Sequence, residues 1–166
     1  MEVRSIEAVA SALNAAGVRY LIVGGLAVNA HGYERLTRDL DLVIGLEPGN
    51  ITNGLRALMA IGYQMVIPIT PEEFADAGRR EKWRKEKNMI VLKLWSDTHR
   101  RTPIDLFVYE PFDFEREHAA AKRIEVAAGL PATVIGYEGL IAMKLAAGRE
   151  KDLQDVAALR RLEAHR

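Results

Sequence analysis

The sequence predicts an α+β domain in which helices flank a mixed, mostly antiparallel sheet and a pair of helices follows at the C-terminus. Short apolar runs of strand composition recur from about residue 20 to residue 135. Segments with helical spacing of apolar residues lie before, between and after these runs. Two of the runs are joined by the short polar turn Ser96 to Thr102, which predicts an antiparallel pair.

The chain of 166 residues is most simply one domain, with a core over about residues 1–127 and C-terminal helices over about residues 137–163. Apolar residues make up 49% and charged residues 28% of the chain, which is ordinary for a soluble globular protein. Basic and acidic residues number 23 each, so the overall charge neither favours nor excludes nucleic acid as a partner. Any electrostatic attraction to nucleic acid would have to come from a local cluster of basic residues.

The chain contains no cysteine, which excludes disulfides, thiolate catalysis and cysteine-ligated zinc and fits a reducing compartment. No apolar stretch approaches the length of a membrane span, and the first residues lack the layout of a signal peptide. We therefore expect a cytoplasmic protein with no membrane partner.

The predicted helices have either apolar residues at helical spacing or a terminal signal. The first lies between a Ser5 cap and Gly17. Pro71, followed by Glu72 and Glu73, has the composition of a first helical turn. Helices are expected at Ser5–Ala16, Leu26–Ala30, Ile51–Ile61, from Pro71, and at Phe114–Lys122, Tyr137–Ala147 and Lys151–Glu163.

The predicted strands are apolar runs bounded by glycine, proline or polar turns. The loop Gly45 to Asn53, which contains Pro48-Gly49, follows the second of them. Strands are expected at Tyr20–Val23, Leu40–Ile44, Gly62–Thr70, Asn88–Trp95, Pro103–Tyr109, Ile124–Val126 and Thr133–Ile135.

Two aspartates stand at alternate positions where the second strand begins. Successive side chains of a strand point to opposite faces, so Asp39 and Asp41 share one face. Like charges at that separation repel, and one carboxylate takes up a proton unless a cation lies between them. The preceding turn has Gly24 and Gly25, which let the backbone approach a ligand, and the helix N-terminus after them offers N–H groups to an anion. Phosphate beside a carboxylate-bound divalent metal would make a nucleotide site.

A third acidic residue, Asp105, lies in an otherwise apolar strand, where burial without a partner is costly. If that strand neighbours the one beginning near Asp39, the three carboxylates can bind two divalent ions, Mg²⁺ or Mn²⁺, and activate a hydroxyl for in-line attack on phosphorus. The structural alternative is that Asp39 caps a turn and Asp105 pairs with Arg38 or Arg101.

These residues resemble the signature of the nucleotidyltransferase (DNA polymerase beta-like) superfamily. The resemblance rests on Val23-Gly24-Gly25 and, about a dozen residues later, Asp39-Leu-Asp41, with Asp105 where the third carboxylate of that family would fall. It implies a nucleotidyltransferase-type sheet and catalytic, metal-binding roles for the three aspartates. This chain departs from the family signature at one position: many members have serine where this chain has Gly25. Phosphate would then depend on backbone N–H groups, and glycine also occurs there in antibiotic-modifying members.

The segment from Leu140 to Asp155 is similar to one found in small bacterial nucleotidyltransferase-like proteins related to the abortive-infection (AbiE-type) toxins. Lys144 falls on the apolar side of its predicted helix, so its ammonium must reach solvent or meet an anion. The structural interpretation pairs it with Asp152 or Asp155, whereas the resemblance directs it at a triphosphate. Arg149 and Lys151 can add to that anion site, while the two aspartates orient Lys144 and Lys151.

Arg35, Thr37 and Arg38 precede the acidic strand, where the family often has a basic residue and threonine; either arginine can contact phosphate or neutralise the aspartates. His31 is read as a packing residue of a helix end. The cluster Arg79 to Lys87 has six basic and two acidic residues around Trp83. It fits an RNA-binding face or, more simply, a solvated helix with Glu81–Lys85 and Lys82–Glu86 pairs.

The expected function is therefore metal-dependent transfer of a nucleotide monophosphate from an NTP, ATP among the candidates, to an acceptor hydroxyl. The resemblance implies tRNA, a protein or a small molecule as the acceptor, and a toxin–antitoxin or phage-defence setting with a cognate antitoxin. The alternatives are a non-catalytic member that binds a nucleotide or a partner, for which Gly25 is the support, and a purely structural interaction protein.

Overall fold

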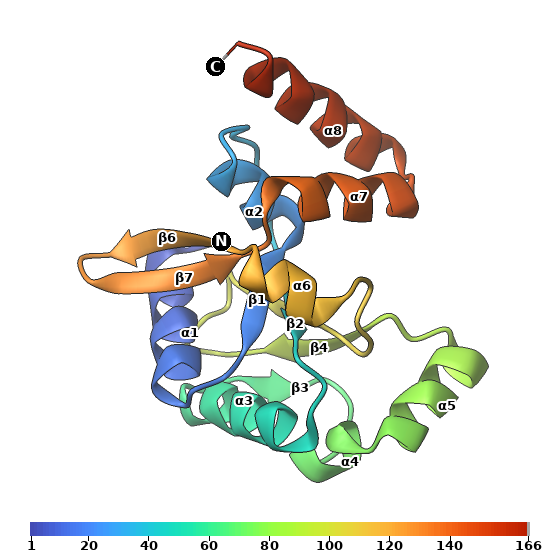
Figure 1. Cartoon of the computed structure of the whole chain (residues 1–166). Helices are drawn as coiled ribbons and strands as arrows, with labels where there is room; N and C mark the ends of the chain where they lie inside the picture. Colours follow the sequence, from blue (N-terminus) through green and yellow to red (C-terminus); the bar gives the residue numbers. More distant parts are fainter. Residues whose placement is uncertain (166) are drawn as a thin grey trace.

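A seven-stranded sheet forms the centre of the computed structural model, which describes residues 1–165 (Figure 1). The strand order is β3-β4-β5-β2-β1-β7-β6. β1 pairs with β7 and β2 with β5 in parallel, and the other four pairings are antiparallel, which confirms the predicted mixed, mostly antiparallel sheet. The strands are β1 Tyr20–Val23, β2 Leu40–Ile44, β3 Gln64–Met65, β4 Val91–Trp95, β5 Ile104–Phe107, β6 Lys122–Ala127 and β7 Leu130–Val134.

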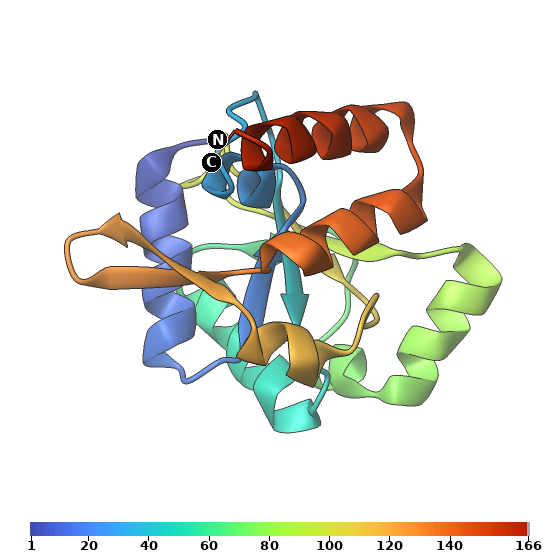
Figure 2. The ribbon, with the colours of Figure 1, turned by 45° about the horizontal axis from the view of Figure 1, so that its top comes forward.

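The helices gather into separate groups around this sheet (Figures 1 and 2). The first and third helices pack side by side, and the second lies against β1 and β2. The last two helices pack on each other beside the second, while the fifth stands to one side next to the fourth. The helices are α1 Val3–Ala15, α2 Gly24–Ala30, α3 Pro48–Ala60, α4 Pro71–Ala75, α5 Ala77–Lys87, α6 Phe114–Ala119, α7 Tyr137–Ala147 and α8 Glu150–Glu163.

Four helices begin earlier than the sequence predicts: α1 and α2 by two residues, α3 by three and α8 by one. Glu47 accepts hydrogen bonds from the backbone N–H groups of Gly49 and Asn50, so α3 already starts at Pro48. Ser5 does not cap α1, which starts at Val3. Its hydroxyl is buried and lies 2.9 Å from Nδ1 of His99.

The predicted strand Gly62–Thr70 is wrong over most of its length, since only Gln64 and Met65 pair with β4. The Val66 N–H still bonds to the Lys93 carbonyl, but Pro68 has no N–H to continue an edge strand. The chain turns away, and Val66 is left 57% exposed.

The core lies on the central strands, where all four residues of β1 are buried. In β5 the burial alternates, with Ile104 and Leu106 inside and Asp105 and Phe107 on the other face, as the period of two predicts. None of the helices in the described part of the chain is long and apolar enough to cross a membrane.

A chain of ion pairs holds α7 and α8 against the loop before β2. Asp155 accepts Arg35 Nε at 2.7 Å and Nη2 at 3.0 Å, and it also accepts Lys144 Nζ at 2.7 Å. Asp152 accepts the same Lys144 Nζ at 3.0 Å and Arg149 Nε at 2.5 Å. Both aspartates and Lys144 are buried. The C-terminal helices are thereby fixed by charge pairing as well as by apolar packing.

We expect Asp155→Asn to lower the free energy of unfolding by about 3 kcal/mol, because it leaves a buried Lys144 and the bidentate Arg35 without their full counter-charge. Urea titration followed by circular dichroism measures this. Glu81→Gln is the matched control, since it breaks an exposed pair with Lys85 and should change stability by less than about 0.5 kcal/mol. Equal effects of the two substitutions would contradict the structural role given to Asp155.

Candidate functional site

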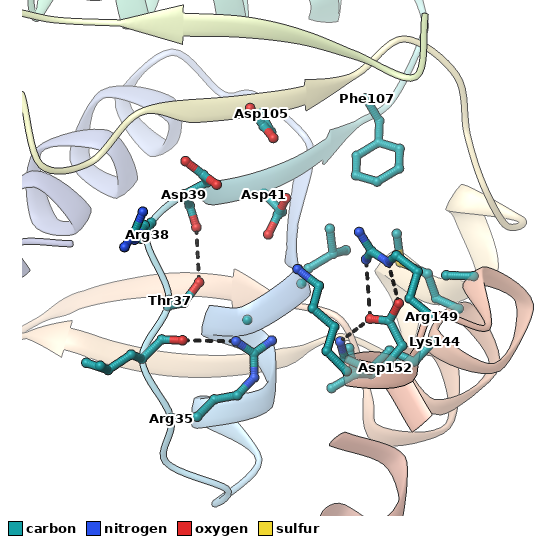
Figure 3. A pocket seen from close by; sticks show the side chains of 18 residues that line it. Arg35, Thr37, Arg38, Asp39, Asp41, Asp105, Phe107, Lys144, Arg149 and Asp152 are labelled. Atoms are coloured by element: carbon teal, nitrogen blue, oxygen red, sulfur yellow. Dashed lines mark hydrogen bonds and ion pairs between the residues drawn. The ribbon is translucent and has the colours of Figure 1, made fainter. Parts of the chain in front are cut away.

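The three aspartates predicted from the sequence lie together at one end of two neighbouring parallel strands. Asp41 of β2 is directly opposite Asp105 of β5, and Asp39 precedes β2 by one residue. Their side chains converge in Figure 3. Parallel pairing at this register therefore places carboxylates from distant parts of the chain side by side.

All ten predicted site residues line one cavity of about 480 Å³. One wall has the three aspartates. The opposite side has Arg35 from the loop before β2, Lys144 of α7 and Arg149 at the start of α8 (Figure 3). The lining residues are Gly24, Gly25, Arg35, Thr37, Arg38, Asp39, Asp41, Asp105, Lys144 and Lys151, with Arg149, Asp152 and six others beside them.

A second cavity of about 490 Å³ shares six lining residues with the first, namely Asp41, Asp105, Phe107, Met143, Ala147 and Arg149. Its other walls are mainly apolar and aromatic, and Phe107 and Tyr109 follow Asp105 along the same face of the sheet. The two cavities thus differ in character, one polar and charged and the other apolar, and the carboxylates stand between them.

The Asp41 carboxyl is unusually hard to ionise. Burial, followed by the charges of Asp105 and Asp39, raises its pKa to about 6, and a hydrogen bond from the Gly25 backbone offsets part of this rise. A bound cation would relieve the repulsion among the three carboxylates.

The donor set fits a hard divalent cation, because Mg²⁺ and Mn²⁺ prefer carboxylate oxygens. Within residues 1–165, however, no three acidic or histidine side chains converge closely enough to form a metal centre by themselves. Mg²⁺ is usually held by one or two carboxylates together with substrate phosphates. Asp39 and Asp41 therefore suit an ion that arrives with a nucleotide.

The glycine turn leaves no room for side chains. Gly24 has φ +65°, and a Cβ there would lie 1.9 Å from Asp41 Oδ2. A Cβ on Gly25 would lie 2.4 Å from Thr37 Oγ1 and 3.2 Å from Arg35 Nη1. The two glycines thus allow the acidic strand and the loop before it to approach α2 closely.

The loop before β2 is held in place at both of its ends. The backbone of Arg35 makes two hydrogen bonds to the Asn29 side chain, and the Thr37 hydroxyl donates to the Asp39 carbonyl at 3.4 Å. The guanidinium of Arg35 is bound to Asp155, so this arginine links the loop to α8. Arg38 is exposed and stands beside Asp39 at the cavity (Figure 3).

Lys144 forms the ion pairs that the structural interpretation of the sequence predicted, because its buried ammonium is bound by both Asp152 and Asp155. Burial raises the pKa of Asp152, but hydrogen bonds from Arg149 and Lys144 hold it below its usual value. Lys151 is exposed at the cavity and, among the described residues, has no ion-pair partner. The charge of Lys151 is therefore less neutralised by neighbouring carboxylates than the charge of Lys144.

Lys93 of β4 was not among the site residues predicted from the sequence. Its ammonium lies 2.8 Å from Asp105 Oδ1, so Asp105 does form an ion pair, but with this lysine and not with Arg38 or Arg101. The hydrogen bond raises the pKa of Lys93. The sequence contained the information to predict this pair, because a hairpin with its turn from Ser96 to Thr102 places Lys93 opposite Asp105.

Two further predictions concern residues outside the cavity. His31 is buried, with Nε2 2.8 Å from the Ile135 carbonyl oxygen, which confirms its packing role. On α5 the predicted Glu81–Lys85 pair is present, whereas the predicted Lys82–Glu86 pair is not among the ion pairs of the described residues. Trp83 is partly buried against Phe74. That indole face is packed within the fold, which favours the solvated-helix interpretation of the basic cluster.

The fold can be compared with a solved structure. A crystal structure of an antigenic nucleotidyltransferase-like protein from Paracoccidioides brasiliensis matches with a TM-score of 0.60 and 17% sequence identity. The match covers 97% of this chain and 76% of that chain. The fold is nucleotidyltransferase-like. No protein-family model matches the chain, and no curated protein matches its sequence.

Gly24→Ala should displace the Asp41 carboxylate and weaken Mn²⁺ binding in the presence of ATP by about tenfold or more. Isothermal titration calorimetry measures the affinity. Gly17→Ala is the matched control, because Gly17 also has φ +65° but a Cβ added there would meet no atom within 4 Å. Equal losses in both variants would mean that backbone strain alone, and not the contact with Asp41, lowers the affinity.

Asp41→Asn should stabilise the metal-free protein at pH 7. The folded state keeps a proton up to a pKa of about 6, whereas the reference value is 3.8, so the free energy of unfolding falls as pH rises between these values. Removing this carboxylate should raise Tm by about 6 °C at pH 7 in EDTA, which corresponds to about 2 kcal/mol. The gain should shrink toward pH 4.

Differential scanning calorimetry at pH 4 and pH 7 tests this dependence. The exposed Asp97, changed to Asn, is the control and should give no such pH-dependent gain. A gain for Asp41→Asn that is equal at both pH values would contradict the raised pKa.

Proposed function

We propose that this protein transfers a nucleotide monophosphate from an NTP to an acceptor hydroxyl and releases pyrophosphate. The supporting observation is a cavity of about 480 Å³ that is lined by the carboxylates of Asp39, Asp41 and Asp105 and by several cationic side chains. In the reaction the acceptor oxygen bonds to the α-phosphorus, the bond from that phosphorus to the pyrophosphate oxygen breaks, and the hydroxyl loses its proton.

Asp39 and Asp41 would hold Mg²⁺ or Mn²⁺, which when bound supplies positive charge to the phosphates and polarises them. Asp105 stands next to Asp41 on the neighbouring strand and would accept the proton of the acceptor hydroxyl. Because the site excludes part of the solvent, as the burial of Asp41 indicates, charge pairing there is stronger than in water.

The basic side of the cavity would bind the triphosphate. Arg38 and Lys151 are exposed at the cavity, and Arg149 reaches it from the start of α8. Arg35 and Lys144 are already engaged by aspartates, so they would act mainly by adding positive potential and by fixing the wall. Gly24 and Gly25 would let the phosphates approach the backbone.

The acceptor would enter from the second cavity. An in-line displacement requires the attacking oxygen and the pyrophosphate on opposite sides of the phosphorus. The largely apolar second cavity borders Asp41 and Asp105. Of the cations that line the first cavity, Arg149 also borders the second, whereas Arg35, Arg38, Lys144 and Lys151 do not. A tRNA end, a protein hydroxyl or a small molecule are the acceptors to be tested.

The biological setting that we propose is a toxin–antitoxin or phage-defence pair, supported by the similarity of the segment Leu140 to Asp155 to AbiE-type proteins. A cognate antitoxin would then be a partner. The test is co-purification of the tagged chain with the product of a neighbouring gene, together with growth arrest on expression without it.

A non-catalytic, nucleotide-binding protein is the second candidate. The observations that favour it are the ion pairs that already occupy Lys144 and Asp105. A protein of this kind would bind an NTP with Mg²⁺ and release no pyrophosphate.

A transfer assay with each α-³²P-labelled NTP, Mg²⁺ or Mn²⁺, and bulk tRNA or a cell lysate tests the reaction. Label should appear on a discrete band. The double variant Asp39→Asn, Asp41→Asn should lower transfer by about 10³-fold or more, because several kcal/mol of metal-dependent stabilisation are removed. Asp97→Asn, an exposed aspartate outside the cavity, should retain full transfer.

Retained transfer in the folded double variant would refute the roles of Asp39 and Asp41. Nucleotide binding by calorimetry without transfer to RNA, protein or small hydroxyl compounds would select the non-catalytic candidate. Absence of any Mg²⁺-dependent nucleotide binding would indicate a structural interaction protein.

A further inference from the structure

A lysine is built into the carboxylate cluster. The Lys93 ammonium lies 2.8 Å from Asp105 Oδ1, and the Asp105 side chain is only 15% exposed. We propose that Lys93 takes the place of a second divalent cation at Asp105, so that the site binds a single Mg²⁺ or Mn²⁺ per nucleotide through Asp39 and Asp41. This inference rests on the proposed function and departs from the two ions that the sequence predicts.

The sheet register, rather than a chance surface contact, places Lys93 there. Lys93 of β4 is directly opposite Asp105 in an antiparallel pair, and Asp105 is directly opposite Asp41 in a parallel pair. Directly opposed residues point to the same face and have Cβ atoms about 5 Å apart, well within the reach of a lysine. A slip of one residue would turn Lys93 to the opposite face, so the register fixes its side.

The charges of the cluster match one divalent ion. Three carboxylates and one ammonium give a net charge of −2, which a single Mg²⁺ neutralises. A second ion would have to bind at Asp105 against the repulsion of an ammonium that already occupies Oδ1. In the described part of the chain the other oxygen, Oδ2, has no hydrogen-bond partner, which leaves it for the acceptor hydroxyl.

Lys93 is therefore a positioning residue, which acts on the acceptor through Asp105. It binds one oxygen of that carboxylate and thereby turns this oxygen away from the reaction. Since Lys93 is 60% exposed, its removal should not impair folding, and effects of substitution can be read at the site.

Native mass spectrometry with Mn²⁺ and each of the four α,β-methylene NTP analogues counts the ions in the protein–nucleotide complex. We expect one Mn²⁺ in the unchanged protein and two in Lys93→Met. Lys93→Arg keeps the cation and should again show one. Lys87→Met is the matched control, because it removes an exposed lysine of α5 and should leave the count at one. Lys93→Gln repeats the test in case the methionine variant does not fold.

Two Mn²⁺ ions in the unchanged protein, or one in the folded Lys93→Met and Lys93→Gln variants, would overturn the inference. The proposed function fails in a different way, namely when no Mn²⁺-dependent nucleotide complex forms with any of the four analogues. One Mn²⁺ in both the unchanged protein and Lys93→Arg, together with two in Lys93→Met, supports the inference, while the transfer assay decides whether the protein is catalytic.

Discussion

The pairing of β2 with β5 is the constraint on which the rest of the site depends. This pairing places Asp41 directly opposite Asp105. The pairing of β5 with β4 then places Lys93 on the other side of Asp105, on the same face of the sheet. Because side chains alternate along a strand, the residues on the other face are the buried Leu42 and Leu106. The apolar core and the charged site are thus two faces of one sheet, and neither can change register without the other.

The C-terminal helices complete the site through buried charge pairs as well as through apolar packing of residues such as Leu140 and Leu159. Arg35, Lys144 and Arg149 surround Asp152 and Asp155, which leaves one net positive charge beside the carboxylate wall. The buried aspartates hold the cations in fixed positions and keep them from collapsing onto the acidic strands. The cavity therefore retains separated regions of opposite charge, the property that binding of a metal–nucleotide complex requires.

The sequence was most informative where periodicity and composition act locally. The alternation in Pro103–Tyr109 and the glycine turn after Val23 predicted the strands, the helix between them and the facing carboxylates. The strand Gly62–Thr70 failed because β composition says little about whether an edge has a partner. Partners of charged residues also escaped prediction, since Lys144 had two candidate anions and Asp105 had several cations. Tertiary packing decides the partners of Lys144, whereas the register of the β4–β5 hairpin already indicates Lys93 as the partner of Asp105.

Gly25 gains a different meaning from the structure. On sequence alone, glycine where many nucleotidyltransferases have serine supported a member without activity. A Cβ at this position would lie 2.7 Å from the Thr37 Cβ as well as 2.4 Å from its hydroxyl. Thr37 in turn donates a hydrogen bond to the carbonyl of Asp39, so any side chain at position 25 would push on the start of the acidic strand. The glycine is therefore a packing requirement of the loop that carries Arg35 and Thr37.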